Sequence, residues 1–179
     1  MESNTKPSMF QTTLIWGLIT GFATVIYSLI LYFLGLSLNK AAGYLSYVII
    51  IGGIFLGSKA YRDQSLGGFI SYGKALGTGV LISLFTSILF VVYTILLYTV
   101  IDPELVNKTI EMSQLQLEER GMNADQIEKG MEITKNFFVP LAAVSVFFAF
   151  VFFGFIFSLI TSAIVKKDGD AFTRDTANV

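Results

Sequence analysis

The sequence predicts an all-α protein: an integral membrane four-helix bundle with an extracytoplasmic helical hairpin between transmembrane helices three and four. The first observation behind this prediction is composition, since 54% of the residues are hydrophobic and only 14% are charged. Soluble domains carry about 25% charged residues. The second observation is segregation, because the charges leave four long stretches almost free of them. A soluble domain of 179 residues could not bury this much apolar surface.

Each apolar stretch is long enough to cross about 30 Å of hydrocarbon as a helix, although the second, with 17 residues from Ala41 to Gly57, is near the lower limit. The first is too long for a signal peptide and has no small-residue cleavage site, so we expect it to be retained. We therefore predict a single membrane domain over 13–165, between cytoplasmic tails at 1–12 and 166–179. Its transmembrane helices are predicted at 13–36, 41–58, 75–101 and 137–165.

The distribution of Lys and Arg predicts that both termini face the cytoplasm. Four crossings place both tails and the loop between helices two and three on one side, which carries Lys6, Lys59, Arg62, Lys74, Lys166, Lys167 and Arg174. The opposite side carries Lys40 and Lys135 close to helix ends, with three further basic residues at Lys108, Arg120 and Lys129. Basic residues near helix ends are retained in the cytoplasm. The polar segment 102–136 is therefore expected outside.

That polar segment is predicted to form two antiparallel helices. Asp102-Pro103-Glu104 is a helix start signal, with a capping residue, a proline at the first helical position and an acid in the first turn. Gly121 suits the left-handed position that ends a helix. Asn123 and Gln126 resemble a capping box for the second helix. The stretch 121–123 is then a short turn between helices.

The hairpin is amphipathic, and its apolar face is the candidate partner surface. Helical spacing gathers five apolar residues on it: Val106, Ile110, Leu117, Ile127 and Met131. Its other face is acidic, since 102–136 contains eight carboxylates and four bases, a net charge of −4. Two such helices alone are marginal in water. We expect them to lean on the outer end of the bundle, on a second copy, or on a partner.

Small residues recur four positions apart in the transmembrane helices, a spacing that lets helix backbones approach closely in lipid. These helix-packing residues are Gly17, Gly21, Gly53, Gly57, Gly73, Gly77, Gly154, Ser158 and Ser162. They indicate packing within one bundle, while homodimerisation or contact with another membrane protein would use the same pattern.

Several activities are excluded by what the chain lacks. It has no His and no Cys, so it offers no imidazole or thiolate as nucleophile, base or metal ligand. No Asp, Glu, Lys, Arg or His lies within the four apolar runs, although proton-coupled carriers bury such a residue despite a penalty of about 2.5–3.5 kcal/mol. A net charge of −1 gives no basic face for nucleic acid. We expect no enzymatic activity, no cofactor and no metal site.

The polar groups within the runs are hydroxyls. They are Thr20, Thr24, Ser28, Ser83, Thr86, Ser87, Ser145, Ser158, Thr161 and Ser162. Such hydroxyls bond to neighbouring helices or to backbone carbonyls. Lining a route for a neutral solute is the other interpretation.

Four segments in fixed order carry a resemblance to a known family. They are Gly67-Gly68-Phe69-Ile70-Ser71-Tyr72-Gly73-Lys74-Ala75-Leu76-Gly77, then Ile101-Asp102-Pro103, the Gly121 turn, and Phe153-Gly154-Phe155-Ile156 ahead of Lys166-Lys167. From Thr12 to Lys167 the chain resembles the small bacterial membrane proteins catalogued as domain of unknown function 4199, typical of Bacteroidetes. The resemblance implies four helices and the bacterial inner membrane, and it carries no established activity or catalytic residues.

Together these observations predict a non-enzymatic integral membrane protein that acts as a scaffold or accessory protein, or binds a partner, through its external hairpin. Its expected surroundings are the lipid bilayer and either further copies of itself or another membrane protein. The alternative is a small transporter or channel subunit for a neutral or lipid-like solute, lined by the hydroxyls of helices one, three and four.

Overall fold

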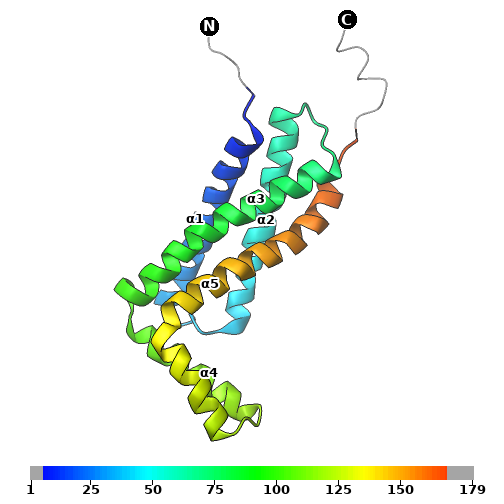
Figure 1. Cartoon of the computed structure of the whole chain (residues 1–179). Helices are drawn as coiled ribbons and strands as arrows, with labels where there is room; N and C mark the ends of the chain where they lie inside the picture. Colours follow the sequence, from blue (N-terminus) through cyan, green and yellow to red (C-terminus); the bar gives the residue numbers. More distant parts are fainter. Residues whose placement is uncertain (1–5, 169–179) are drawn as a thin grey trace, which may run out of the picture. The chain divides into compact units, whose positions relative to one another are not determined.

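A computed structural model describes residues 6–168, and these residues are helical apart from short connections (Figure 1). Within this part of the chain the β structure is limited to one isolated bridge between Ile70 and Lys167. The predicted tails 1–12 and 166–179 are described only in part, and Arg174 lies outside the described residues. The helices are α1 (Met9–Phe33), α2 (Lys40–Ser65), α3 (Tyr72–Leu96), the π-helical turn η1 (Leu97–Ile101), α4 (Glu104–Glu119) and α5 (Ala124–Val165).

Four helical segments are long and apolar enough to cross a membrane, as the sequence predicted. They are Met9–Phe33, Lys40–Ser65, Tyr72–Ile101 and Thr134–Val165. The largest difference from the predicted bounds is in α2, which continues to Ser65 rather than ending at residue 58. Because Lys59 and Arg62 interrupt hydropathy but not helix geometry, the apolar run marks only the part of α2 that suits lipid.

Polar side chains fix where α1 and α2 begin. Ser8 and Gln11 form a reciprocal capping box at the start of α1, and the Asn39 carboxamide oxygen accepts the Ala42 N–H at 3.2 Å at the start of α2. Each cap satisfies backbone donors that have no partner within the helix. The α1 helix therefore begins four residues before the apolar run from which its position was predicted.

The α5 helix bends at Phe137, whose backbone (φ −123°, ψ 22°) is not helical. Pro140 explains the bend, because its ring meets the carbonyl of residue 136 and removes one hydrogen bond of the helix. The prediction placed a helix boundary between 136 and 137. The structure instead has a kink there, and the chain stays helical on both sides.

The contacts divide the described chain into two compact units. The four-helix unit comprises 6–89 and 149–168, and the hairpin unit comprises 90–148. Both divisions fall inside long helices, α3 and α5, rather than at the predicted boundaries of the hairpin. Each unit has its own buried cluster.

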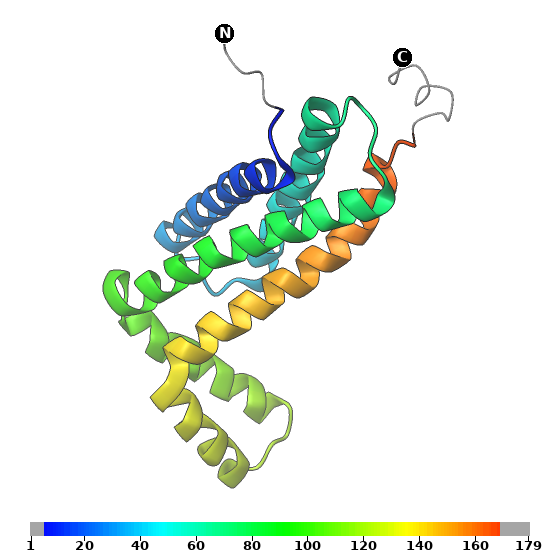
Figure 2. The ribbon, with the colours of Figure 1, turned by 45° about the horizontal axis from the view of Figure 1, so that its top comes forward.

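In the four-helix unit, α3 packs against each of the other three helices. Ile82 of α3 is buried with Ile50 and Ile54 of α2, and Trp16 of α1 and Phe157 of α5 pack against that cluster. Figure 2 shows α3 between α1 and α5 in this unit. The α3 helix is thus the central helix of the unit, in contact with the other three.

One end of the four-helix unit holds the loop 66–71 and both ends of the described chain. Ile70 and Lys167 exchange two backbone hydrogen bonds of 3.0 Å. The Ser65 hydroxyl donates to the Pro7 carbonyl at 2.7 Å, and the Arg62 guanidinium donates to the Val165 carbonyl at 3.1 Å. Arg62 and Lys167, two basic residues of the predicted cytoplasmic side, therefore lie at the same end of this unit.

Candidate functional site: the acidic hairpin

The chain passes from α3 to α4 through η1 and a break at Asp102, whose backbone (φ −147°, ψ 82°) is outside helical geometry. The Asp102 carboxylate accepts the backbone N–H of Leu105 at 3.1 Å, which satisfies a free donor at the start of α4. Pro103 has no N–H that would be left unpaired there, and Glu104 complements the positive end of the helix dipole. The start of α4 thus lies at the motif found in the sequence.

The turn between α4 and α5 is a Schellman motif around Gly121. Gly121 has φ +77°, a left-handed conformation that glycine adopts without steric penalty. Its N–H donates to the Glu118 carbonyl at 2.9 Å, and the Met122 N–H donates to the Leu117 carbonyl at 3.3 Å. The Asn123 carboxamide oxygen then accepts the Gln126 N–H at 2.9 Å and caps α5. These bonds reverse the chain within three residues.

The five residues proposed as a partner surface lie together inside the hairpin. Ile110, Ile127 and Met131 are buried in one cluster, and Val106 and Leu117 pack against it. The cluster is the hydrophobic core of the hairpin. Burial of an Ile or Met side chain stabilises by about 1.5–3 kcal/mol. In this conformation the three central residues are covered, so a partner would mainly contact the exposed residues around the cluster.

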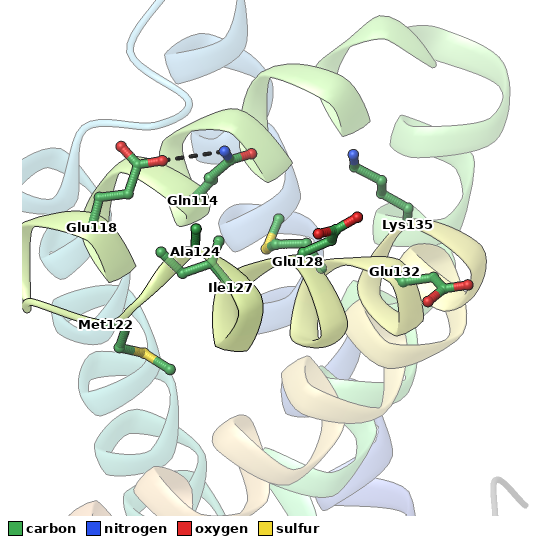
Figure 3. Close-up of a pocket in the computed structure, with 9 residues that line it drawn as sticks. Gln114, Glu118, Met122, Ala124, Ile127, Glu128, Glu132 and Lys135 are labelled. Carbon is green, nitrogen blue, oxygen red and sulfur yellow. Dashed lines mark hydrogen bonds between the residues drawn. The ribbon is translucent and has the colours of Figure 1, made fainter.

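A groove of about 630 Å³ lies on the hairpin (Figure 3), within the usual range of about 300–1,000 Å³ for ligand sites. Its lining residues come from α4, the turn and α5. They are Gln114, Glu118, Met122, Ala124, Ile127, Glu128, Met131, Glu132 and Lys135. Figure 3 shows the Gln114 carboxamide donating to the Glu118 carboxylate on the α4 side, at 3.2 Å. The groove follows the line where the two helices meet.

The groove has an apolar floor and an acidic rim. Ile127 and Met131 in the floor are each 5% exposed, whereas the carboxylates of Glu118, Glu128 and Glu132 are on exposed residues. Lys135 is the basic residue of the lining. Among the described residues, ion pairs join Arg62 to Asp63 and Lys166 to Asp168, so none of them neutralises the rim. The groove carries a net charge of −2.

The rim is not arranged as a metal site. No group of three or more Asp or Glu side chains in the part of the chain that the structure describes is placed to share an ion. Hard divalent cations take six to eight oxygen ligands, mostly from such groups. What the rim offers is a spread of exposed negative charge along two helices.

In the four-helix unit, five of the predicted helix-packing glycines face another helix of the same chain. A Cβ at Gly17 would lie 2.5 Å from the Phe85 Cβ, and one at Gly21 would lie 2.7 Å from Leu89 Cδ2. These gaps are shorter than the 3.5–4.0 Å of carbon contacts. The other three glycines meet their neighbours in the same way: Gly53 faces Thr20, Gly57 faces Trp16 and Ile82, and Gly154 faces Ser83.

The remaining predicted packing residues are placed differently from one another. Ser158 and Ser162 are buried, and Ser158 stands against Gly79, a close approach that the sequence spacing did not single out. A Cβ at Gly73 would meet nothing within 4 Å, and one at Gly77 would meet only Met9 Cε, at 3.2 Å. Periodicity finds small residues, but it does not say which ones face a neighbour.

Most buried hydroxyls of the helices bond to backbone carbonyls. Thr20 donates to Trp16 at 2.7 Å, and Ser158 donates to Gly154 at 2.6 Å. Thr86 instead reaches across to the Gly17 carbonyl of α1, at 3.1 Å. These bonds satisfy the hydroxyls within the protein, which is the packing interpretation of the sequence.

Three buried hydroxyls of the four-helix unit have no hydrogen-bond partner: Thr12, Ser58 and Ser162. They lie on α1, α2 and α5, each three residues from a member of the group formed by Met9, Tyr61 and Val165. One helical turn separates such positions. The three unpaired hydroxyls therefore lie about one helical turn further into the unit than the apolar group at its end.

These features define a class: a small helical protein with four segments suited to a multi-pass membrane protein and a polar hairpin between the last two. The chain belongs to the family described as proteins of unknown function (DUF4199), which matches residues 15–167. The resemblance seen over 12–167 is thus confirmed. No curated protein and no solved structure matches the chain.

The groove was not predicted from the sequence, although all nine of its lining residues lie in the predicted hairpin. Gln114, Met122 and Ala124 have no chemistry that marks them, and Glu128 and Glu132 read as a solvated face. Their spacing of four does place them on one side of α5. Whether a groove forms there depends on which side of α4 packs beside that side of α5. The packing of the two helices decides this, and the sequence pattern does not.

Proposed function

We propose that this protein is a non-enzymatic, multi-pass protein of the bacterial inner membrane that binds a protein partner through its hairpin outside the cytoplasm. One observation carries the proposal. The predicted apolar runs contain no Asp, Glu, Lys, Arg or His, while the hairpin combines its own core with an acidic groove. A grooved polar surface held by helices that offer no reactive groups suits recognition rather than catalysis.

The proposed orientation rests on charge. Lys59, Arg62, Lys74, Lys166 and Lys167 flank helix ends on one side, and contacts join the chain start, the 66–71 loop and the chain after α5 at one end of the four-helix unit. Basic flanks of this kind stay in the cytoplasm. The hairpin, separated from them by one crossing of α3 and one of α5, then lies outside.

Because the chain has no native cysteine, a single introduced cysteine can test the orientation. Glu111→Cys on the hairpin and Gln64→Cys near the basic end both replace exposed residues. A membrane-impermeant maleimide is expected to label Glu111→Cys in intact spheroplasts and Gln64→Cys only after lysis. The reverse pattern would show that the hairpin faces the cytoplasm.

Photo-crosslinking tests the binding role. A benzophenone amino acid at exposed hairpin positions Leu115 and Glu128 is expected to give discrete protein adducts in native membranes. A benzophenone at Val48 of α2, which is 60% exposed, is the matched control for a lipid-facing surface and should give none. An adduct of twice the chain mass identifies a second copy as the partner. Absence of protein adducts from every hairpin position would refute the proposed function.

A second function is favoured by the unpaired hydroxyls of Thr12, Ser58 and Ser162. A buried hydroxyl without a partner costs about 1–3 kcal/mol, and three near one level would be satisfied by water or by the hydroxyls of a small neutral solute. This set includes Thr12 and Ser58, which the sequence did not single out as lining a route, but it favours the same alternative role, a transporter or channel subunit for a neutral solute.

Proteoliposome swelling with glycerol tests the second function. The triple variant Thr12→Val, Ser58→Ala and Ser162→Ala should abolish protein-dependent swelling. Thr78→Val is the control, since Thr78 is buried but its hydroxyl already donates to the Lys74 carbonyl at 2.7 Å. Swelling no faster than that of empty liposomes with the unaltered protein would exclude glycerol permeation and leave the hydroxyls as bundle packing.

A further inference from the structure

We infer that the hairpin groove takes one basic amphipathic helix of another protein, laid along the line where α4 and α5 meet. The inference deepens the proposed function and rests on it, since it names the class of partner that the hairpin binds. Three properties of the groove support it: its length, its apolar floor and its unneutralised rim.

The length of the groove fits a short helix. Its lining along α5 runs from Ala124 to Lys135, which is about 16 Å at 1.5 Å per residue, or three turns. On α4 the lining positions Gln114 and Glu118 are one turn apart. A groove between two helices can hold a third helix, whose apolar anchor residues recur every three or four positions.

The floor supplies apolar contact. Ile127 and Met131 belong to the hairpin core but also line the groove, and Met122 at the turn is 39% exposed. Methionine side chains adapt to differently shaped apolar partners because they are unbranched and polarizable. Because Ile127 and Met131 are already buried, the apolar surface that a partner helix would newly cover here is mainly that of Met122.

The rim selects a basic partner. Glu118 on one side and Glu128 and Glu132 on the other flank the floor, and no ion pair in the described chain neutralises them. Lysine or arginine side chains beside the apolar anchors would meet these carboxylates on both sides. Complementary charge of this kind raises the association rate and sets the orientation of the partner.

The same charges exclude other occupants. A second copy of the hairpin would bring another segment of net charge −4 against an acidic groove, and like charges in an interface are penalised. Phosphate groups and nucleic acid are repelled for the same reason. A divalent ion finds no set of three carboxylates in the described residues. A basic helix suits both the floor and the rim.

The test uses the full chain in nanodiscs of phosphatidylcholine, a lipid without net charge. The probe is a dye-labelled synthetic peptide of about 14 residues, built from leucine and lysine at helical spacing. Two comparison peptides are the leucine–glutamate version and a lysine–serine version that lacks the apolar face. Fluorescence anisotropy above that of empty nanodiscs is expected for the leucine–lysine peptide, with binding at least about tenfold weaker for each comparison peptide.

Charge reversal then locates the site. Glu128→Lys with Glu132→Lys is expected to weaken binding about tenfold or more, whereas Glu111→Lys with Glu119→Lys makes the same change in net charge outside the groove and should weaken it less than about threefold. All four residues are exposed, so both variants should fold. Equal weakening by the two pairs, or equal binding of the leucine–glutamate peptide, would overturn the inference.

Failure of the inference is distinguishable from failure of the proposed function. When the crosslinking experiment is extended to Glu111 and Glu132, adducts from Leu115 and Glu111 but none from Glu128 and Glu132 would retain a binding hairpin and reject the groove. Absence of adducts from all four positions would reject both. If excess leucine–lysine peptide abolishes the adducts from Glu128 and Glu132, the peptide and the native partner compete for the same site, which supports the groove.

Discussion

The two units of this protein differ in how much polar surface they bury and in what they expose. In the four-helix unit the buried positions include twelve serine and threonine residues, while Phe10, Phe22, Val48 and Ile164 on its surface are each more than half exposed. In the hairpin the buried cluster is made of Ile110, Ile127 and Met131, and the exposed positions include Glu111, Glu118, Glu128 and Glu132. The four-helix unit therefore buries many hydroxyls beside its isoleucines and exposes apolar side chains, whereas the hairpin buries an apolar cluster and exposes carboxylates.

This contrast indicates a different solvent for each unit. A soluble protein rarely exposes large contiguous apolar patches, but lipid tails solvate them without penalty. Between helices in lipid, close approach of small residues and interhelical hydroxyl contacts replace the hydrophobic effect. The hairpin instead buries apolar side chains and exposes charge, as a structure in water does. The chain therefore folds by two sets of rules, and each can be tested separately.

The largest expected effect is on the hydrophobic core of the hairpin. Ile127→Ala should lower the free energy of opening the hairpin by about 2–5 kcal/mol, because it removes buried methyl groups and leaves a cavity. Leu115→Ala is the control, since Leu115 is 52% exposed. Amide hydrogen exchange of α4 and of the first turns of α5 measures the change. Equal effects of the two variants would mean that the hairpin core does not stabilise it.

The sequence predicted the helices of both units more reliably than it predicted their contacts. Four apolar runs determine four helices because lipid leaves the backbone no other way to satisfy its hydrogen bonds. Asp102, Gly121 and Asn123 mark ends of the hairpin helices because capping is a local interaction. The bounds of α2 were predicted poorly, since hydropathy reports where lipid ends and not where a helix ends.

A smaller effect is expected where helices of the four-helix unit meet. Gly53→Leu would drive a side chain into Thr20 of α1, whereas Gly52→Leu places the same side chain where nothing lies within 4 Å. Overpacking costs about 1–3 kcal/mol. The Gly53 variant should lose its monodisperse fraction at a lower temperature in detergent, with the Gly52 variant unchanged. Similar melting of both variants would argue against glycine-mediated packing of α1 on α2.

Contacts between helices were predicted only in part, for a physical reason. Gly53, Gly73 and Gly79 look alike in the sequence, but only Gly53 and Gly79 stand against a neighbouring helix. Which side of a helix faces inward depends on the rotation of every helix in the bundle, and small residues on several faces leave that rotation open. The acidic groove depends in the same way on the register between α4 and α5.

The smallest effect compares two asparagines of the hairpin. Asn123→Ala removes the side chain that accepts the Gln126 N–H at the start of α5 and should destabilise the hairpin by about 1 kcal/mol. Asn107→Ala replaces an exposed residue within α4 and should stabilise it by up to about 0.7 kcal/mol, because alanine has the higher helix propensity. Hydrogen exchange in α4 and α5 should therefore shift in opposite directions. If both variants shifted it the same way, the start of α5 would not depend on its cap, and the hairpin would owe its stability to packing alone.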